Sequence, residues 1–258
     1  MKFENTEVFN FEGALRGMRM PFKGTAKNDS KYCIPNQCIT CRYGDNQEPT
    51  DNPYSWDPCS SEDVMWTPYM IGEDDMRVAQ RLVAAGSPHN KWLRQVFVSM
   101  DITASIKWWA QLDQYKVGTV TDSESVMHTI TKLPITKECF EMDDYNGSLL
   151  VYDREPYKAN FIVDDIWEKI INYCETLRQR YIETKDPGYW NELVRLLPES
   201  YLQTRTWTGN YAVLRNIITQ RSGHRLLSWQ QFIDHCKKLP YAEQFLFYKG
   251  ENKNEQIS

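Results

Sequence analysis

Polar side chains able to bind a ligand are concentrated between residues 195 and 229. Asn210, Asn216 and Arg221 lie there among apolar residues that recur every three or four positions. These apolar residues are Val213, Leu214, Ile217 and Ile218. Such spacing is typical of a helix that buries one face and keeps the other polar. We therefore expect a helix to start at the W-T-x-N motif and to line a ligand-binding cavity with its polar face.

A cluster of positive groups follows at the end of this expected helix: Arg221, His224 and Arg225. Arg221 and Arg225 are spaced to share a helical face, and guanidinium groups match carboxylates, phosphates and the edge of a pyrimidine. Such crowding of positive charge favours an anionic ligand. The segment therefore predicts a local anion site, although the whole chain carries a formal charge of -5.

Hydroxyl groups are concentrated in a second stretch, residues 117–128, which reads VGTVTDSESVMH. Its backbone N–H groups and the hydroxyls of Ser123 and Ser125 are suitable donors for phosphate or sugar oxygens. An ordinary Ser/Thr-rich turn that caps the next helix explains the composition equally well. The residues alone leave both interpretations open.

Four cysteines lie in an irregular stretch, residues 31–70, in the order C-x4-C-x2-C followed by a distant fourth: Cys33, Cys38, Cys41 and Cys59. Four thiolates can close a tetrahedral zinc site and would stabilise a loop too polar to form its own core. Because four cysteine ligands leave no open position, such a zinc ion would be structural. The alternative is a surface insertion with unpaired thiols.

Composition and charge exclude several classes of protein. A negative net charge argues against general binding of nucleic acid. No apolar run approaches the length of a membrane span, and the N-terminus lacks the layout of a signal peptide. Seven cysteines, an odd number, favour a reducing compartment. The sequence contains no G-x-S-x-G, H-E-x-x-H, P-loop or G-x-G-x-x-G motif. We expect a cytoplasmic protein without a membrane segment.

Hydrophobic periodicity predicts the elements that position these residues. Helices are expected over residues 73–86, 105–116, 161–186, 189–197 and 229–239, and residues 91–105 are expected to pass from a helix into a buried strand. Residues 134–160 are expected to form a loop region. The apolar stripe of the longest helix is expected to face the core or another subunit. This stripe comprises Ile166, Ile170, Tyr173, Leu177 and Tyr181.

A basic segment near the N-terminus, GALRGMRMPFKG, carries Arg16 and Arg19 on either side of Gly17. We expect this segment to cover the core, and cradling of an anion is the alternative. Without internal repeats or a clear linker, residues 1–258 are expected to form one domain, with the cysteine stretch at 31–70 as an insertion.

The C-terminal stretch resembles the signature of the flavin-dependent thymidylate synthases, in which a Leu-Pro precedes a Thr, a W-T-x-N motif, a polar helix and an Arg. The matching residues are Pro198, Thr204, Trp207, Thr208, Asn210, Asn216 and Arg221. The family's central signature places a His about two dozen residues before a Gln-x-x-Arg-His-Arg motif and a phosphate-binding Ser. His89, Gln111 and Ser125 fit that pattern.

The chain also departs from the family pattern. Where the family has Arg-His-Arg, residues 114–116 read Gln-Tyr-Lys, and its Arg-Tyr falls on Met-His at 127–128. The family's flavin-contacting Arg after W-T-x-N falls on Ala212, although Arg215 lies one turn later. The nucleotide-contacting set is therefore better retained than the flavin-contacting set. The resemblance covers roughly residues 72–240 and identifies a divergent branch of phage or bacterial type.

The resemblance implies an α+β fold with a central, mainly antiparallel sheet and long flanking helices, assembled as a homotetramer. It implies an enzyme that methylates dUMP, or a related pyrimidine nucleotide, using methylenetetrahydrofolate, reduced FAD and NADPH. The protein's task in such a reaction is positioning and electrostatics. The alternative is a non-catalytic nucleotide-binding or nucleotide-sequestering protein whose flavin site has been lost.

The resemblance also implies roles for individual residues. The nucleotide-binding candidates are Gln111, Lys116, Ser123, Ser125, Arg195 and Arg221, of which Arg221, Gln111 and Ser125 are the catalytic candidates. The cofactor-binding candidates are His89, Tyr115, Lys116, Asn210, Arg215, Asn216, His224 and Arg225.

Overall fold

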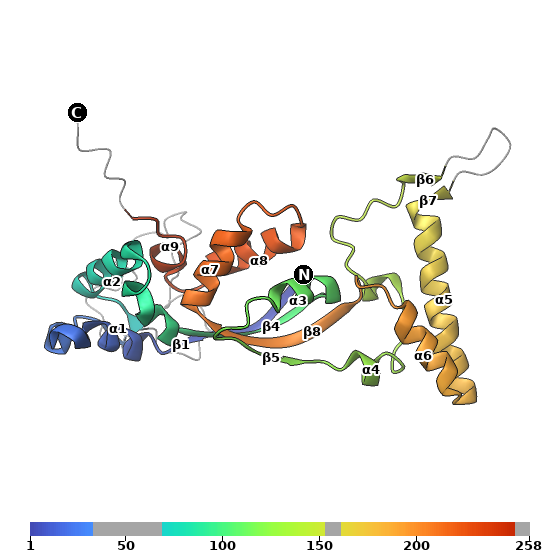
Figure 1. The fold of residues 1–258 in the computed structure, drawn as a ribbon, viewed down its shortest axis with the longest axis horizontal. Coiled ribbons are helices and arrows are strands. Elements are labelled where there is room, and N and C mark those ends of the chain that lie inside the picture. Colours follow the sequence, from blue (N-terminus) through green and yellow to red (C-terminus); the bar gives the residue numbers. More distant parts are fainter. Residues whose placement is uncertain (33–68, 153–160, 251–258) are drawn as a thin grey trace, which may run out of the picture.

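A four-stranded antiparallel sheet runs through the middle of the molecule (Figure 1). The structure, a computed structural model, describes residues 1–32, 69–152 and 161–250. The strand order is β1 (Lys2–Phe9), β4 (Phe97–Ser105), β8 (Leu202–Asn210), β5 (Val120–Ser123). The two longest strands are paired along their whole length, from Phe97 opposite Asn210 to Ser105 opposite Leu202. This confirms the expected α+β fold with a central antiparallel sheet.

The two faces of the sheet differ in polarity because side chains alternate along each strand. On one face the β4 side chains are fully buried: Val98, Met100, Ile102 and Ala104. On the other face hydroxyls and a carboxylate pair across β4 and β8, as in Ser99–Thr208, Thr206–Asp101 and Thr103–Thr204. The helices α3 (Ile106–Leu112), α7 (Tyr211–Arg221) and α8 (Leu227–Lys237) lie on one side of the sheet (Figure 1).

The remaining elements extend the sheet at both ends (Figure 1). At the end that carries α1 and α2, these are α1 (Phe11–Arg19), η1 (Met20–Phe22), η2 (Thr25–Lys27), β2 (Lys31–Tyr32), β3 (Tyr69–Met70), α2 (Glu73–Ala85), η3 (His89–Gln95) and α9 (Ala242–Phe245). At the end that carries α5, they are α4 (Val126–Thr129), η4 (Lys137–Cys139), β6 (Leu150–Tyr152), β7 (Phe161–Ile162), α5 (Val163–Thr184) and α6 (Pro187–Leu196).

Two hydrophobic clusters form inside this arrangement. The larger one lies between the sheet and its helices and is rich in tryptophan, with Trp92, Trp108, Trp109, Trp207 and Trp229 all buried. The smaller one packs α5 against α6 and the loop before them, around Ile135, Phe140, Cys174 and Leu193. Part of the apolar stripe expected on α5 faces outward, since Tyr173 is 64% exposed.

The expected helices agree with the structure, whereas three of the four strands of the central sheet were not expected. The helix expected over 105–116 ends earlier, at Leu112. Strands β1, β5 and β8 carry many polar residues, so no apolar alternation identified them. The loop region expected at 134–160 contains β6, and its residues 153–160 lie outside the described part. The expectation that the N-terminal basic segment covers the core is confirmed, because Ala14, Leu15 and Met18 of α1 are buried.

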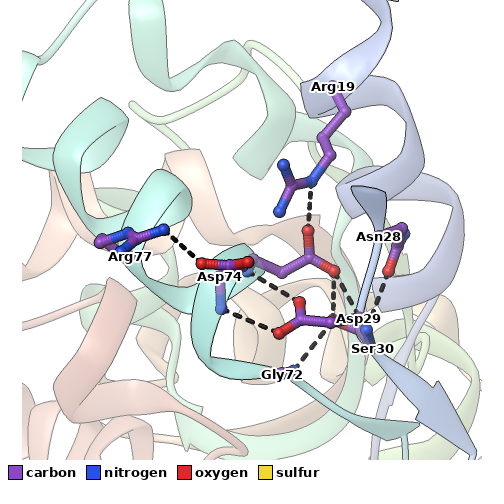
Figure 2. Close-up of polar contacts among 8 residues, drawn as sticks. Arg19, Asn28, Asp29, Ser30, Gly72, Asp74 and Arg77 are labelled. Atoms are coloured by element: carbon purple, nitrogen blue, oxygen red, sulfur yellow. Dashed lines mark hydrogen bonds and ion pairs between the residues drawn. The ribbon is translucent and has the colours of Figure 1, made fainter. Parts of the chain in front are cut away.

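A buried carboxylate ties α1 to α2 and to the segment between them (Figure 2). Asp75 accepts hydrogen bonds from Arg19 Nε at 2.5 Å and from the Ser30 hydroxyl at 2.5 Å. Asp29 caps the first turn of α2 by accepting from the backbone N–H groups of Asp74 and Asp75 at 2.9 and 3.0 Å. The first turn of α2 is therefore held by two carboxylates: its own Asp75, which bonds to Arg19 and Ser30, and Asp29, which caps its backbone N–H groups.

A partly buried histidine lies beneath the edge strand β1. The His235 ring stacks on Phe3 with centroids 4.1 Å apart, and its Nε2 lies 3.0 Å from Thr6 Oγ1. Burial, with a smaller contribution from Lys238, lowers the pKa of His235 from 6.5 to about 4. Protonation of this ring therefore opposes folding.

We expect His235 to make the protein less stable in acid. Its folded pKa lies below that of the unfolded chain, so the unfolded chain binds the proton more readily, and stability falls as the pH drops from about 6.5 to about 4. After allowance for solvent screening at this partly exposed ring, the loss is about 1–2 kcal/mol. Urea unfolding at pH 7 and pH 4.5 should show a smaller pH dependence in His235→Gln than in the wild type. Equal pH dependence in both proteins would exclude this role.

Candidate functional site

Arg221, the last residue of α7, is held in a fixed orientation by two aromatic rings. Its guanidinium lies 4.7 Å from the ring centre of Trp229 and 5.6 Å from that of Tyr115. Its Nε donates to the Tyr115 hydroxyl at 2.9 Å, and that hydroxyl donates to Gln220 Oε1 at 3.1 Å. Neither Nη group has a hydrogen-bond partner within the described residues, so both remain available to a ligand. A guanidinium fixed in this way loses little side-chain entropy on binding.

Gln111, on helix α3, links that helix to Trp229, the ring against which Arg221 lies. The buried indole of Trp229 donates from Nε1 to Gln111 Oε1 at 2.8 Å. The Trp229 ring also contacts Trp108 at 5.1 Å between centroids, and Trp108 contacts Trp109 at 5.1 Å. The structure thus brings the three candidate residues Gln111, Tyr115 and Arg221 together around a row of three tryptophans.

A second arginine, Arg205 on β8, occupies the opposite end of this tryptophan row. Its guanidinium lies 4.5 Å from the ring centre of Trp109. Its Nη1 donates to the Asp113 carboxylate at 3.2 and 3.3 Å, and its Nε donates to Gln203 Oε1 at 2.9 Å. Arg205 was not predicted from the sequence, because Trp109 and Asp113 come from a separate segment. The signal that could have found it is the spacing of Gln203, Arg205 and Trp207 at every second position, which is typical of one face of a strand.

Asn210 and Asn216, both expected near the cofactor, have different environments. Asn210 is buried at the start of α7, where its Oδ1 accepts from the Val213 N–H at 3.1 Å and its Nδ2 donates to the Gly118 carbonyl at 3.4 Å. This side chain acts as a helix cap. Asn216 is exposed, and its Oδ1 accepts from Gln220 Nε2 at 2.9 Å. The amide of Asn216 is therefore the more accessible of the two.

Arg215 fastens the C-terminal part of the described chain to α7. Its guanidinium donates to the carbonyls of Phe245 and Leu246 at 2.9 Å each and to that of Tyr248 at 2.6 Å. Burial lowers the pKa of this guanidinium. Both Nη groups donate to these three carbonyls, and the side chain is largely committed to holding the chain.

The two arginines expected on one helical face at residues 221–225 lie apart in the structure. Helix α7 ends at Arg221, and Gly223 has a positive φ of 87°, so Arg221 and Arg225 do not share a helical face. His224 remains near the site, with its ring 6.1 Å from that of Trp229, and its Nδ1 accepts from the Leu226 N–H at 3.2 Å. Arg225 is exposed. The glycine turn thus separates the two arginines.

The hydroxyl-rich stretch contains both a strand and a short helix. Ser123 ends β5, directly opposite Arg205 in the pairing with β8. Ser125 follows, and its hydroxyl lies 2.6 Å from Nδ1 of His128 on the surface. Lys116 is exposed and makes no hydrogen bond or ion pair within the described residues. The β5–β8 pairing thus places the exposed Ser123 beside Arg205.

Two further candidates lie elsewhere in the fold. His89 is exposed at the start of η3, and Arg195 is exposed on α6, where it pairs with Glu192. Neither residue contacts Arg221, Tyr115 or Trp229 within the part of the chain that the structure describes. The zinc candidates Cys33, Cys38, Cys41 and Cys59 lie outside the described residues. Within those residues, no cluster of His, Cys, Asp or Glu has the arrangement of a metal site, and no helix is long and apolar enough to span a membrane.

Comparisons with known proteins identify the fold. No protein-family model and no curated protein sequence matches the chain. A crystal structure of the flavin-dependent thymidylate synthase ThyX from Helicobacter pylori, complexed with FAD and dUMP, matches 96% of this chain and 98% of its own, with a TM-score of 0.57 and 15% identity. A second structure of Helicobacter pylori ThyX with FAD and dUMP matches 93% and 94%, with a TM-score of 0.56 and 15% identity. The chain therefore has the fold of the flavin-dependent thymidylate synthases.

Proposed function

We propose that this protein is a divergent flavin-dependent thymidylate synthase, which methylates dUMP or a related pyrimidine nucleotide with methylenetetrahydrofolate and reduced FAD. One observation carries the proposal: the Arg221 guanidinium lies against the Trp229 ring and donates to the Tyr115 hydroxyl, with both of its Nη groups available. The N–H donors of a fixed guanidinium suit a carbonyl oxygen of a uracil ring. The bound FAD and dUMP of the two structural neighbours support the same class of ligand.

The residues around Arg221 supply binding and orientation. Gln111 has an amide nitrogen that its bond with Trp229 leaves unused, and Tyr115 fixes the plane of the Arg221 guanidinium. Ser125, at the accessible end of the hydroxyl-rich stretch, is suited to donate to a phosphate oxygen. These groups position a nucleotide without a protein nucleophile, which suits a reaction whose rate depends on orientation.

The donor set also suits a flavin nucleotide. Asn216 and Arg225 are exposed and the His224 ring lies 6.1 Å from that of Trp229, and amide and guanidinium donors suit the ring carbonyls and phosphates of such a cofactor. When bound, FAD would supply the reducing power for the methyl transfer. The protein's contribution would be to hold the flavin against the pyrimidine.

Arg221→Gln should weaken binding of dUMP by roughly ten- to a hundredfold, because loss of a charge-assisted contact costs about 1.5–3 kcal/mol. Isothermal titration calorimetry on the purified protein provides the measurement. Arg180→Gln, the same change at an exposed arginine of α5, is the matched control and should leave the affinity unchanged. Equal affinity of wild type and Arg221→Gln would remove the proposed nucleotide site.

A second candidate function is a nucleotide-binding or nucleotide-sequestering protein without flavin. The observation that favours it is that Asn210 and Arg215, both assigned to the cofactor, use their side chains for a helix cap and for the C-terminal carbonyls. The visible spectrum separates the two functions. Bound flavin in the purified protein supports the enzyme, and a colourless protein that binds dUMP but refuses FAD supports the alternative. We also propose the homotetramer as the working assembly, which sedimentation can test.

A further inference from the structure

We infer that Arg205 is the phosphate-binding arginine of this site, contributed by strand β8 and directed toward the hydroxyl-rich edge at Ser123 and Ser125. The inference rests on the proposed function, because it assigns one part of the same nucleotide. It predicts two arginines with separate tasks, Arg221 at the base and Arg205 at the phosphate.

Arg205 lies on the strand that pairs with the hydroxyl-rich stretch. Its Cα lies opposite Ser123 in the β5–β8 pairing. Gln203, which accepts from Arg205 Nε, donates from Nε2 to the Glu124 carbonyl at 2.6 Å, and the Glu124 N–H donates to the Thr204 carbonyl at 2.9 Å. These bonds hold residues 123–125 against β8 beside the guanidinium. The hydroxyl donors and the cation therefore meet at one edge.

The Arg205 guanidinium is held in place by its neighbours. The Trp109 ring supports its face, Gln203 holds Nε and Asp113 holds Nη1, while Nη2 has no hydrogen-bond partner within the described residues. Only 17% of the Arg205 side-chain surface is exposed, so it is held more firmly than a surface arginine. A fixed guanidinium with an unused N–H pair is a suitable donor for a phosphate oxygen.

Residues 111–128 carry more negative than positive charge. From Gln111 to His128 the chain contains one lysine, Lys116, and three acidic residues. A phosphate dianion placed against this stretch needs a further cation, and Lys116 is a flexible, exposed point charge. Arg205 enters from β8 and contacts this stretch at Asp113, whereas Arg221 contacts it at Tyr115. The row Trp109–Trp108–Trp229 joins its stacking ring to that of Arg221, which places both arginines around one packed unit.

Replacement of Asp113, the ion-pair partner of Arg205, tests the phosphate role of Arg205 in a second way. Its carboxylate neutralises Arg205 and is 44% exposed. An anionic ligand must compete with it for the guanidinium. Replacing Asp113 with Asn keeps an acceptor of the same shape but removes the competing negative charge, so it should favour a phosphate.

The experiment compares dUMP with deoxyuridine, which lacks the phosphate, by calorimetry on the full chain. We expect Arg205→Gln to weaken dUMP binding by roughly ten- to a hundredfold and to leave deoxyuridine binding within about twofold of the wild type. Asp113→Asn should strengthen dUMP binding by about two- to fivefold, with no effect on deoxyuridine. Arg180→Gln, on α5, controls for the loss of one positive charge.

The outcomes separate this inference from the proposed function. If Arg221→Gln weakens both ligands and Arg205→Gln weakens neither, the nucleotide site stands and the role of Arg205 is overturned. If Arg205→Gln weakens both ligands equally, Arg205 acts through the structure and the phosphate assignment is overturned. If the wild type binds neither ligand, the proposed function itself fails. Should Arg205→Gln not fold, unchanged dUMP affinity in Asp113→Asn overturns the assignment.

Discussion

Replacing Asp75 with alanine is expected to lower the free energy of unfolding by about 3–5 kcal/mol, the cost of leaving a buried charge without its partner. Asp75 is fully buried, and the Arg19 side chain that pairs with it is only 10% exposed. The Ser30 hydroxyl and N–H donate to the same carboxylate at 2.5 and 3.2 Å. Removal of the Asp75 side chain therefore leaves Arg19 Nε and the Ser30 hydroxyl without this acceptor, while the Ser30 N–H still donates to Asn28 Oδ1 at 2.9 Å (Figure 2).

Urea unfolding of Asp75→Ala, with its preceding neighbour Asp74→Ala as the matched control, measures this effect. Asp74 is 57% exposed and pairs with exposed Arg77, so its loss should change stability by no more than about 0.5–1 kcal/mol. Similar losses in both variants would show that the acidic first turn of α2 acts as a whole, through the helix dipole. A loss confined to Asp75→Ala would establish the ion pair as the fastening between α1 and α2.

The contrast between these neighbouring residues illustrates a limit of sequence reasoning. The run Glu73-Asp74-Asp75 predicted a helix start correctly, because acidic residues favour the first turn. Nothing in the run distinguishes the buried carboxylate from the exposed one. The difference arises from Arg19 and Ser30, which lie more than 40 positions earlier in the chain.

The same limit applies to the sheet. The helices were predictable because apolar residues recur at helical spacing over many turns, as in α2 and α5. Strand β8 reads LQTRTWTGN, and its polar side chains occur on both faces. Its threonines bond to Ser99, Asp101 and Thr103 of β4, and Arg205 stacks on Trp109, so tertiary contacts rather than local pattern make it a strand.

The candidate site was partly predictable. Resemblance to the thymidylate synthase signatures led to Gln111, Tyr115 and Arg221, which the structure brings together through Trp229. The same resemblance did not reveal that Asn210 caps α7 or that Arg215 holds the C-terminal carbonyls. A motif specifies residue types at given spacings, and the competing hydrogen-bond partners of each side chain depend on the folded chain.

Trp229→Ala is expected to have the second large effect, because one indole serves both the core and the site. Its ring is fully buried against Trp108 and Phe232, and truncation of a buried aromatic residue costs about 3–5 kcal/mol. The same change removes the surface on which Arg221 stacks and the donor to Gln111 Oε1. Both stability and nucleotide affinity should therefore fall.

Trp229→Phe separates these two effects, since a phenyl ring retains most of the packing but has no N–H and attracts a cation less strongly. We expect it to lose about 1–2 kcal/mol of stability, measured by urea unfolding, and to bind dUMP several-fold more weakly than the wild type. Trp190→Phe, at a half-buried tryptophan of α6, is the control and should leave the affinity unchanged. Full retention of dUMP affinity in Trp229→Phe would show that Tyr115 alone orients Arg221. A loss as large as that of Arg221→Gln would mean that the indole determines the position of the guanidinium.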